Sequence, residues 1–228
     1  MSDTLPTLSI IGGTGALGGG LAARWASAGY PVVLGSRSSE KAVHAAQKID
    51  TGNNAPPVRG TDNKLAAAQG DIVIITVPFA NHRAILQEIS SGIAGKIVVD
   101  ATVPLMPPKV GTVQLPTAGS AASLTQDALG ERADVVAAFH NVAADKLRNP
   151  GLIDCDVLVC GNKKAARQTV IKLVEGLGMR GLHAGPIANS AAAEALTSVI
   201  ITINRIYKAD GAGIRITGDL TAPDTGSS

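Results

Sequence analysis

The order of apolar and polar positions predicts a chain in which strands and helices alternate. Short apolar runs are typical of strands buried on both faces of a parallel sheet, and the segments between them repeat apolar residues at helical spacing. The strands are expected at 8–11, 31–35, 71–79, 96–100 and 134–139, and the helices at 15–29, 38–50, 62–69, 80–91 and 119–129. Residues 51–60 and the proline-rich stretch 104–116 are expected to be loops. The alternation predicts an α/β fold of the Rossmann type, with a doubly wound parallel sheet.

The pattern changes after residue 139. A short strand at 156–160, a helix at 163–177, a strand at 179–182 and a long helix from 189 to 208 predict a small C-terminal α/β domain. The long helix carries apolar residues over so much of its surface that it needs two packing partners. A subunit interface and burial within the monomer would both meet this need. We therefore expect domains at 1–139 and 140–219, followed by a disordered tail at 220–228.

A glycine-rich turn joins the first strand to the first helix and organises the chain around it. Gly13, Gly15 and Gly18 read as Gly-x-Gly-x-x-Gly, with a strand before them and a helix after them. In that motif the glycines permit a tight turn, a close approach to a pyrophosphate and close packing of helix on strand. The free N–H groups at the start of the helix favour an anion. The turn therefore predicts a dinucleotide site, against the alternative of a glycine turn without a ligand.

The same glycines also fit a second spacing, Gly12-x-x-Gly15-x-x-Gly18, which is typical of short-chain dehydrogenases. Those enzymes use a Tyr-x-x-x-Lys pair. Tyr30 and Tyr207 are not followed by lysine four residues later, so the pair is absent.

The end of the second strand predicts which dinucleotide is bound. NAD sites usually place an acidic residue there, to accept a hydrogen bond from the ribose 2′-hydroxyl. Here the strand ends in Gly35, Ser36 and Arg37, and Lys41 follows one helical turn later. A guanidinium, an ammonium and a hydroxyl around one point suit a 2′-phosphate. We expect NADP; the alternative is a helix start with solvated charges.

Composition excludes several other classes of function. The net charge is +2 and the chain has one Trp, two Tyr and two Phe, so neither a basic surface nor stacking residues indicate nucleic-acid binding. No apolar run is long enough to span a membrane, and residues 1–7 do not resemble a signal peptide. Cys155 and Cys160 fit neither a disulfide nor a zinc pattern. We expect a cytoplasmic protein with reduced thiols.

The histidines and acids offer little acid–base machinery. His140 follows the strand at 134–139, at the predicted domain junction, where a second ligand would approach the nicotinamide. His82 begins a helix beside the Val-Pro-Phe edge and is expected to have a structural role. The acids Asp71, Asp100, Asp134 and Asp156 bracket strands and look like strand ends, and no metal cluster or Ser-His-Asp set stands out. Hydride transfer between two stacked rings would need none of these groups, because proximity and orientation suffice.

Several segments in order along the chain resemble the NADPH-dependent reductases of the deazaflavin coenzyme F420. They are Ile-Gly-Gly-Thr-Gly-Ala-Leu-Gly, Leu-Gly-Ser-Arg-x-x-Glu-Lys-Ala, Thr-Val-Pro-Phe, Phe-His-Asn-Val-Ala, Val-Cys-Gly-Asn, Gly-Pro-Ile-Ala-Asn-Ser and Glu-Ala-Leu-Thr. The resemblance implies NADP in the large domain, F420 in a cleft formed with the small one, and direct hydride transfer without a catalytic side chain. It also implies small-molecule redox coenzymes as partners, and we expect a homo-oligomer.

The resemblance assigns roles to residues of this chain. The glycine loop, with Gly13, Gly15 and Gly18, would bring Thr14, Ala16 and Leu17 to the pyrophosphate; Ser36, Arg37 and Lys41 would bind the 2′-phosphate; Val77 and Pro78 would flank the ribose and nicotinamide; His140, Val142 and Ala143 would line the deazaflavin pocket. Two alternatives remain at this point. One is an NADPH-dependent reductase of another flavin or of a metal, and the other is an NADP-binding sensor without activity.

Overall fold

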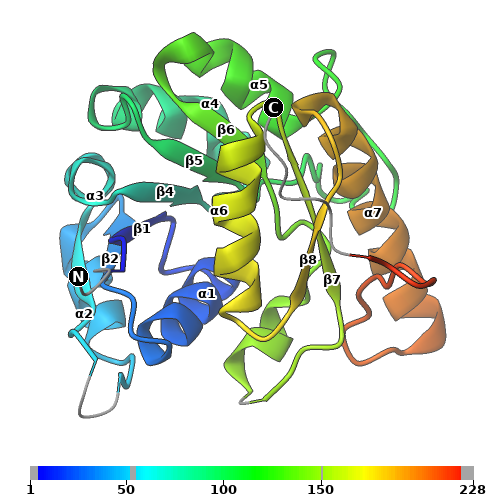
Figure 1. The fold of residues 1–228 in the computed structure, drawn as a ribbon, viewed down its shortest axis with the longest axis horizontal. Coiled ribbons are helices and arrows are strands. Elements are labelled where there is room, and N and C mark those ends of the chain that lie inside the picture. The colour runs from blue at the N-terminus through cyan, green and yellow to red at the C-terminus, as the bar shows by residue number, and fades with distance from the viewer. Residues whose placement is uncertain (1–4, 52–54, 150, 222–228) are drawn as a thin grey trace.

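An eight-stranded sheet runs through the molecule, with helices on both of its faces (Figure 1). The computed structural model describes residues 5–51, 55–149 and 151–221. The strand order is β3-β2-β1-β4-β5-β6-β7-β8, and every neighbouring pair is parallel except β6 and β7. The strands are β1 Leu8–Ile11, β2 Val32–Ser36, β3 Arg59–Asp62, β4 Ile72–Ile75, β5 Ile97–Asp100, β6 Asp134–Ala137, β7 Asp156–Gly161 and β8 Arg180–His183. The predicted doubly wound sheet is confirmed, with one antiparallel pair that was not predicted.

The helices divide between the two faces of the sheet and form two hydrophobic cores. Helices α1, α2 and α6 pack with one core, and α3, α4 and α5 pack with the other. The helix α7 lies beside β7 and β8 in Figure 1 and contacts α5 and β7. The helices are α1 Ala16–Ser27, α2 Ser39–Ala46, α3 Asn63–Gln69, α4 Phe79–Ile89, α5 Ala121–Leu129, α6 Lys164–Glu175 and α7 Ser190–Tyr207, with single 3-10 turns at Ser90–Gly92, Gly130–Arg132, Ala144–Arg148 and Ile187–Asn189. In the described part of the chain, none of them has the length and apolarity that a membrane span requires.

The edge strand β3 was predicted as loop, and that prediction is wrong for residues 59 and 60. Its sequence, Arg-Gly-Thr-Asp, has no apolar run, because an edge strand needs no continuous burial. Gly60 lies so close to α2 that an added Cβ would stand 2.3 Å from the backbone of Ala42. The contact with α2, rather than strand hydrophobicity, therefore places β3. Residues 52–54 of the predicted loop lie outside the described residues.

Backbone conformation explains where the other elements end. Gly29 (φ +90°) terminates α1 as predicted, whereas Gly119 (φ +91°) delays the start of α5 to Ala121. Phe139 has φ +69°, so β6 ends two residues earlier than expected. The helix α2 ends at Ala46 instead of 50, and Ile49 folds back against the core.

The helix α7 buries a different face from the one its apolar residues suggest. Its buried residues are Ser190, Ala193, Glu194, Ser198 and, from the apolar stripe, Ile200, whereas Val199, Ile203 and Ile206 of that stripe are exposed. The predicted apolar stripe therefore lies on the surface of the monomer over much of its length.

Helix α1 is fastened to the C-terminal half of the chain at its last turn. The Arg24 guanidinium donates to the backbone oxygens of five residues, among them Leu147 in the Ala144–Arg148 turn and Leu177 after α6. Next to it, Trp25 is fully buried, donates from Nε1 to the Leu173 oxygen at 3.0 Å and packs edge-on against Phe139. Segments far apart in sequence therefore meet at one end of α1.

Residues 140–219 contribute β7 and β8, which extend the sheet of residues 1–139 by backbone pairing. The strand β7 pairs with β6 through Val136–Gly161 and Ala137–Cys160 only. Cys155 and Cys160 are both buried and free, as predicted. Of the predicted tail, residues 222–228 lie outside the described residues.

Candidate coenzyme site and adjoining polar cluster

The glycine loop turns sharply between β1 and α1. Gly12 adopts φ +81°, so the positive φ falls one residue before the predicted motif. Gly18 allows α1 to approach the end of β4, since an added Cβ would lie 2.4 Å from Thr76 Oγ1. At Gly15, by contrast, an added Cβ would meet only the Gly12 oxygen, at 3.3 Å. Gly12 and Gly18 therefore shape the loop, and Gly15 leaves open space in front of it.

The first turn of α1 is open to an anion. Gly15 is its N-cap and, among the described residues, no side chain caps this end and no acidic residue lies in its first turn. Thr14, Gly15 and Ala16 are exposed beside it. Backbone N–H groups without an intrahelical partner favour a phosphate at such a position.

A cavity of about 520 Å³ runs from this loop along the carboxyl edge of the sheet, and we call it the glycine-loop cavity. It brings together seven of the residues predicted to bind the coenzyme. Its lining consists of Gly12, Thr14, Gly15, Ser36, Arg37, Ser38, Lys41, Asn63, Thr76, Val77, Pro78, Asn81 and Ile85.

One end of the glycine-loop cavity is cationic. Ser36 ends β2, Arg37 follows it and is exposed, and Lys41 lies in the first turn of α2. The neighbouring strand pairs Asp62 with Ser36, but the Asp62 carboxylate accepts the Leu65 amide at 2.8 Å and caps α3. Two cations and a hydroxyl therefore lie at this end of the cavity, while the Asp62 carboxylate is occupied as the cap of α3.

The other end lies where β4 meets α4. Val77 is buried against Gly12, and Pro78 is the N-cap residue of α4. Thr76 donates from Oγ1 to the Ile11 oxygen at 3.0 Å, which ties the end of β4 to β1. This end offers a fixed, largely apolar wall.

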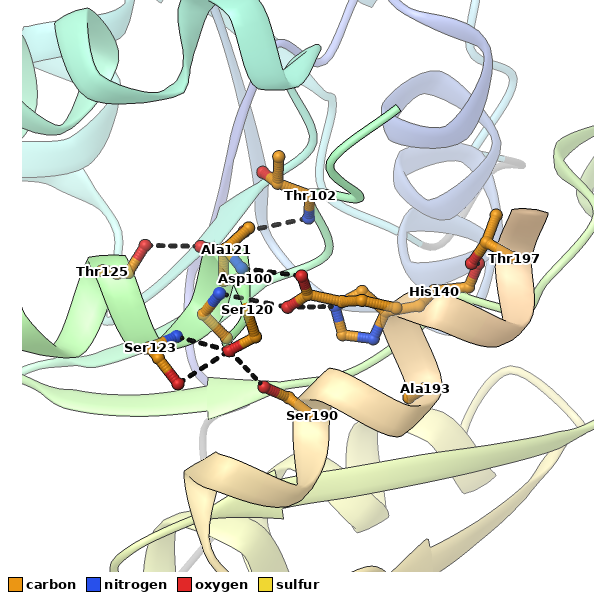
Figure 2. Close-up of polar contacts among 12 residues, drawn as sticks. Asp100, Thr102, Ser120, Ala121, Ser123, Thr125, His140, Ser190, Ala193 and Thr197 are labelled. Atoms are coloured by element: carbon orange, nitrogen blue, oxygen red, sulfur yellow. Dashed lines mark hydrogen bonds and ion pairs between the residues drawn. The ribbon is translucent and has the colours of Figure 1, made fainter. Parts of the chain in front are cut away.

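Beyond it, a buried polar cluster occupies the carboxyl ends of β5 and β6 (Figure 2). It consists of His82, Asp100, Ser120, Thr125, His140, Ser190 and Glu194, all of which are buried. Figure 2 shows Asp100, the last residue of β5, beside Thr102 and Thr125.

Asp100 is fully buried and its carboxylate is saturated with hydrogen bonds. Oδ1 accepts the Thr102 amide at 2.9 Å, and Oδ2 accepts Thr125 Oγ1 at 2.5 Å and lies 2.8 Å from His82 Nε2. Burial alone would raise the pKa of Asp100, but its hydrogen bonds lower it below the ordinary value. For His82, burial lowers the pKa and the bond to Asp100 outweighs it, so the net shift is upward. We therefore treat the two as an ion pair.

Glu194 holds α7 against the N-terminus of α5. Its carboxylate accepts the amides of Ala121 at 2.6 Å and Ala122 at 3.1 Å. The N-cap Ser120 accepts the Ser123 amide and is bonded at 2.8 Å to Ser190, the first residue of α7. Burial raises the pKa of Glu194 to about 8, although the two amide bonds oppose the shift.

His140 lies between these groups with its side chain 1% exposed. Its Nε2 is 3.9 Å from Glu194 Oε1, an ion-pair distance beyond hydrogen-bond reach, and neither ring nitrogen has a hydrogen-bond partner among the described residues. Burial lowers the pKa of His140 to about 4, although the charge of Asp100 and a contact of the ring with the Asp100 backbone, too poorly aligned to count as a hydrogen bond, oppose the shift. The backbone around it is fixed, because Thr197 Oγ1 donates to the His140 oxygen and Asn141 Nδ2 donates to the Ala193 oxygen.

Known proteins match this chain over nearly its whole length. A family model described as "NADP oxidoreductase coenzyme F420-dependent" matches residues 7–104. The F420-dependent NADP reductase of Methanocaldococcus jannaschii is 38% identical over 221 residues, covering 92% of this chain and 97% of that protein. Its counterpart in Methanothermobacter marburgensis is 36% identical, with the same two coverages. A solved structure from Arthrobacter sp. FB24, provisionally assigned as an F420-dependent NADP reductase, is 26% identical, with a TM-score of 0.77 over 93% of this chain and all of that one.

The chain belongs to the F420-dependent NADP reductase family.

Within this family member, the structure separates the predicted site residues into two groups. One group lines the glycine-loop cavity and consists of Thr14, Gly15, Ser36, Arg37, Lys41, Val77 and Pro78. Those after β6 do not line it: the His140 ring faces Glu194, Val142 is half-buried against the core, and Ala143 lines a second cavity of about 430 Å³ with Lys146 and Asp210. Of the loop residues, Gly13 and Gly18 are buried, and Ala16 and Leu17 begin α1 without lining the cavity.

Sequence reasoning missed most of the buried polar cluster. Asp100 reads as a strand end and His82 as a structural residue of a helix, yet they form an ion pair. Glu194 lies among apolar residues of α7 and carries no pattern of its own. The available signal was topological, since Asp100 and His140 end adjacent strands of the predicted sheet.

Proposed function

We propose that this protein transfers hydride directly between NADP(H) and the deazaflavin coenzyme F420. The observation that carries the proposal is the glycine-loop cavity, which joins a cationic end to an apolar wall within a chain that belongs to this family throughout its length. We also propose a division of labour in which residues 1–139 bind NADP and residues 140–219 complete the deazaflavin side.

The residues of the cavity fit NADP. The open space in front of Gly15 admits a pyrophosphate, where Thr14 and the first amides of α1, at Ala16 and Leu17, would bind it. Gly13 and Gly18 keep the loop in shape. Ser36, Arg37 and Lys41 would hold the 2′-phosphate, and Val77 and Pro78 would bear on the ribose and nicotinamide.

When bound, NADP(H) would supply or accept the hydride at its nicotinamide. The chain's own task is then alignment. The wall formed by Val77 and Pro78 is rigid, because Thr76 is bonded to β1 and Pro78 starts α4. A misplacement of about 1 Å between two reacting groups can lower a rate on the order of a hundredfold, so this rigidity is a catalytic contribution.

We assign the deazaflavin side to the segment after β6, which holds His140, Val142 and Ala143. The His140 ring, buried beside Glu194, would anchor this segment, and the half-buried Val142 and Ala143 would be nearest to the second ring. The segment leaves the sheet beside β5 and returns through the Ala144–Arg148 turn to α1, which brings it alongside the glycine loop's own helix.

Anaerobic mixing of the protein with NADPH and F420, followed by deazaflavin absorbance, tests the function. We expect the absorbance of oxidised F420 to fall with an equal loss of NADPH. Failure to reduce F420 while NADPH binds would favour reduction of another flavin or a metal, or a sensor role.

A variant tests the assignment of the second side. Ala143→Phe should abolish F420 reduction and keep NADPH affinity, because the added ring fills the space the deazaflavin needs. Ala165→Phe, on an exposed position of α6, is the matched control and should keep both. Full activity in folded Ala143→Phe would place the second substrate elsewhere.

The exposed apolar face of α7 supports a homo-oligomer as a further part of the proposal. Val199, Ile203 and Ile206 are 44%, 40% and 66% exposed, which is unusual for large apolar side chains on one helix face. Light scattering should give a mass above one chain, and Ile203→Glu should return it to one. The buried free thiols of Cys155 and Cys160 accord with a cytoplasmic location.

A further inference from the structure

The glycine-loop cavity has a third region, between α3 and α4, beyond its cationic end and its apolar wall. Lys41 belongs to α2, which packs on one face of the sheet, whereas Asn63 of α3 and Ile85 of α4 belong to helices on the opposite face. The strand register pairs Asp62 with Ser36, so Asn63 follows directly beside the cationic end. The cavity therefore reaches over the edge of the sheet, from the cations on one face to an amide and an apolar side chain on the other.

Asn63 carries a buried oxygen without a partner. It is the first residue of α3 and is 1% exposed, although it borders the cavity. Its Oδ1 accepts no hydrogen bond from any of the described residues. A buried acceptor left unpaired destabilises a protein markedly, so atoms of this kind are nearly always paired with protein, water or a ligand. The Oδ1 of Asn63 is therefore a point at which the cavity can receive a hydrogen-bond donor.

Glu88 of α4 decides which end of the Asn63 amide faces away from it. The Asn63 Nδ2 donates to Glu88 Oε2 at 3.4 Å. A carboxylate only accepts hydrogen bonds, so the amide has to present its NH2 group to Glu88 and its oxygen to the other side. On that side Oδ1 lies next to the end of β2, 3.1 Å from where a Cβ at Gly35 would stand. A ligand at this point has to donate, because a second acceptor would be repelled.

The chemistry of this region suits the adenine base of NADP. With the 2′-phosphate at Ser36, Arg37 and Lys41, the base is attached to the next carbon of the same ribose, so it has to lie beside the cationic end. Adenine has flat apolar faces, for which Ile85 offers a contact, and its 6-amino group donates hydrogen bonds. Asparagine amides commonly bind this amino group where proteins recognise adenine. An uncharged amide also accepts the bond without repelling the nearby phosphate, as a carboxylate would.

We propose that Asn63 is a specificity-determining residue of the coenzyme site, whose Oδ1 accepts a hydrogen bond from the adenine 6-amino group. Glu88 keeps the amide in the orientation that this bond needs, and the base lies against Ile85. Because Oδ1 is covered as the chain stands, the bond requires a small turn of the side chain towards the cavity, a common change on binding. The assignment rests on the coenzyme site of the proposed function and adds to it the selection of the base.

Calorimetric titration with NADPH and with its hypoxanthine analogue, in which an oxygen replaces the 6-amino group, tests the contact. The unmutated protein should bind the analogue about 10- to 100-fold more weakly, because two acceptors then meet. Asn63→Leu should bring the two affinities close together, mainly by loss of NADPH affinity. Gln69→Leu, which replaces an exposed amide at the end of the same helix, should keep the preference. A preference that survives in Asn63→Leu would overturn the proposal, and so would equal affinities in the unmutated protein, a result that needs no variant to fold.

Glu88→Gln separates the orientation of the amide from simple packing. A glutamine accepts as well as donates, so the Asn63 amide is then free to turn its NH2 group towards a 6-oxygen. The variant should bind the hypoxanthine analogue more tightly than the unmutated protein does, a gain that a merely structural role would not produce. Glu175→Gln, at the exposed end of α6, should change neither affinity. Unchanged affinity for the analogue in Glu88→Gln would contradict the orienting role of Glu88.

These measurements are independent of hydride transfer, because binding is measured without F420. A base preference that depends on Asn63, in a protein that does not reduce F420, would refute the proposed function and leave this assignment standing. Reduction of F420 by NADPH without any base preference would overturn the assignment alone. An equal loss of affinity for both coenzymes in Asn63→Leu would assign the oxygen to the ribose 3′-hydroxyl, which the two share, and would also overturn the proposal.

Discussion

The glycine-loop cavity and the buried polar cluster lie along the same edge of one sheet and use their polar groups in opposite ways. In the cavity, Arg37 and Lys41 are exposed and the first turn of α1 has no side-chain cap among the described residues. In the cluster, the first turn of α5 is filled by Glu194 from within the chain. A helix N-terminus is thus left open where a ligand is expected and satisfied internally where two parts of the fold must be joined. The difference predicts that substitutions in the cavity change binding and those in the cluster change stability.

The largest expected effect separates these outcomes most sharply. Gly15→Val should abolish NADPH binding at concentrations that saturate the unmutated protein, because its side chain would stand where the pyrophosphate approaches. Calorimetric titration measures this. Gly19→Ala, whose Cβ makes only an ordinary contact at 3.4 Å, should bind normally. A folded Gly15→Val protein that still binds NADPH would show that the loop serves another purpose.

The next effect belongs to the cluster. Glu194→Ala leaves the buried amides of Ala121 and Ala122 without an acceptor and should lower the free energy of unfolding by about 2–5 kcal/mol. Urea denaturation measures the loss. Glu175→Ala should change stability by less than about 0.5 kcal/mol. If Glu194→Ala lowered the free energy of unfolding by no more than the control does, the internal cap would be contradicted.

A smaller effect is expected at the cationic end of the cavity. Arg37→Ala should weaken NADPH binding by about 1.5–3 kcal/mol and leave NADH binding nearly unchanged, since only NADPH carries the 2′-phosphate. Arg37 is exposed, so we expect the low end of that range and a further decrease at high salt. Arg83→Ala, an exposed arginine of α4 away from the cavity, is the control. Equal affinities for the two coenzymes in the unmutated protein would contradict the assignment.

The smallest effect is a dependence of stability on pH. The pKa of Glu194 is raised in the folded protein from 4.5 to about 8, so between these values the folded state keeps a proton that the unfolded state has lost. The free energy of unfolding should therefore fall as pH rises through this window. His140, whose pKa is lowered to about 4, opposes the trend below pH 6.5. The raised pKa of His82 adds to the decrease in the free energy of unfolding above pH 6.5.

Denaturation at pH 6.5 and pH 8 isolates the contribution of Glu194. Glu194→Gln should remove a decrease on the order of 1–2 kcal/mol and leave the smaller part due to His82. An unchanged decrease in Glu194→Gln would assign the pH dependence to other groups.

The same contrast explains how far the sequence could be interpreted. Ser36, Arg37 and Lys41 were predictable because local spacing alone brings them together after β2. Glu194 was not, because it meets α5 across more than seventy residues and nothing near it in sequence marks the contact. For α7, apolar periodicity predicted a buried face, but small and polar residues such as Ala193 and Ser198 face inward. Close packing and internal hydrogen bonds decided that face, and periodicity does not report them.

A strand could be predicted from the sequence where its burial alone determines its position. The buried runs of β1 and β4 were found, whereas the edge strand β3 was missed because its position depends on how closely Gly60 approaches α2. The early end of β6 depends on the positive φ of Phe139, a conformation that its residue type does not suggest.

The burial of Trp25 also makes the protein its own optical probe. It is the chain's one tryptophan, and α1 carries the glycine loop about 15 Å away at its other end, at 1.5 Å per residue. Indole emission overlaps the absorption of reduced nicotinamide, so a coenzyme held at that loop should quench the fluorescence by energy transfer. Unfolding would expose the same indole and shift its emission to longer wavelength. In one unlabelled sample, the fluorescence intensity therefore reports coenzyme occupancy and the emission wavelength reports whether the protein is folded.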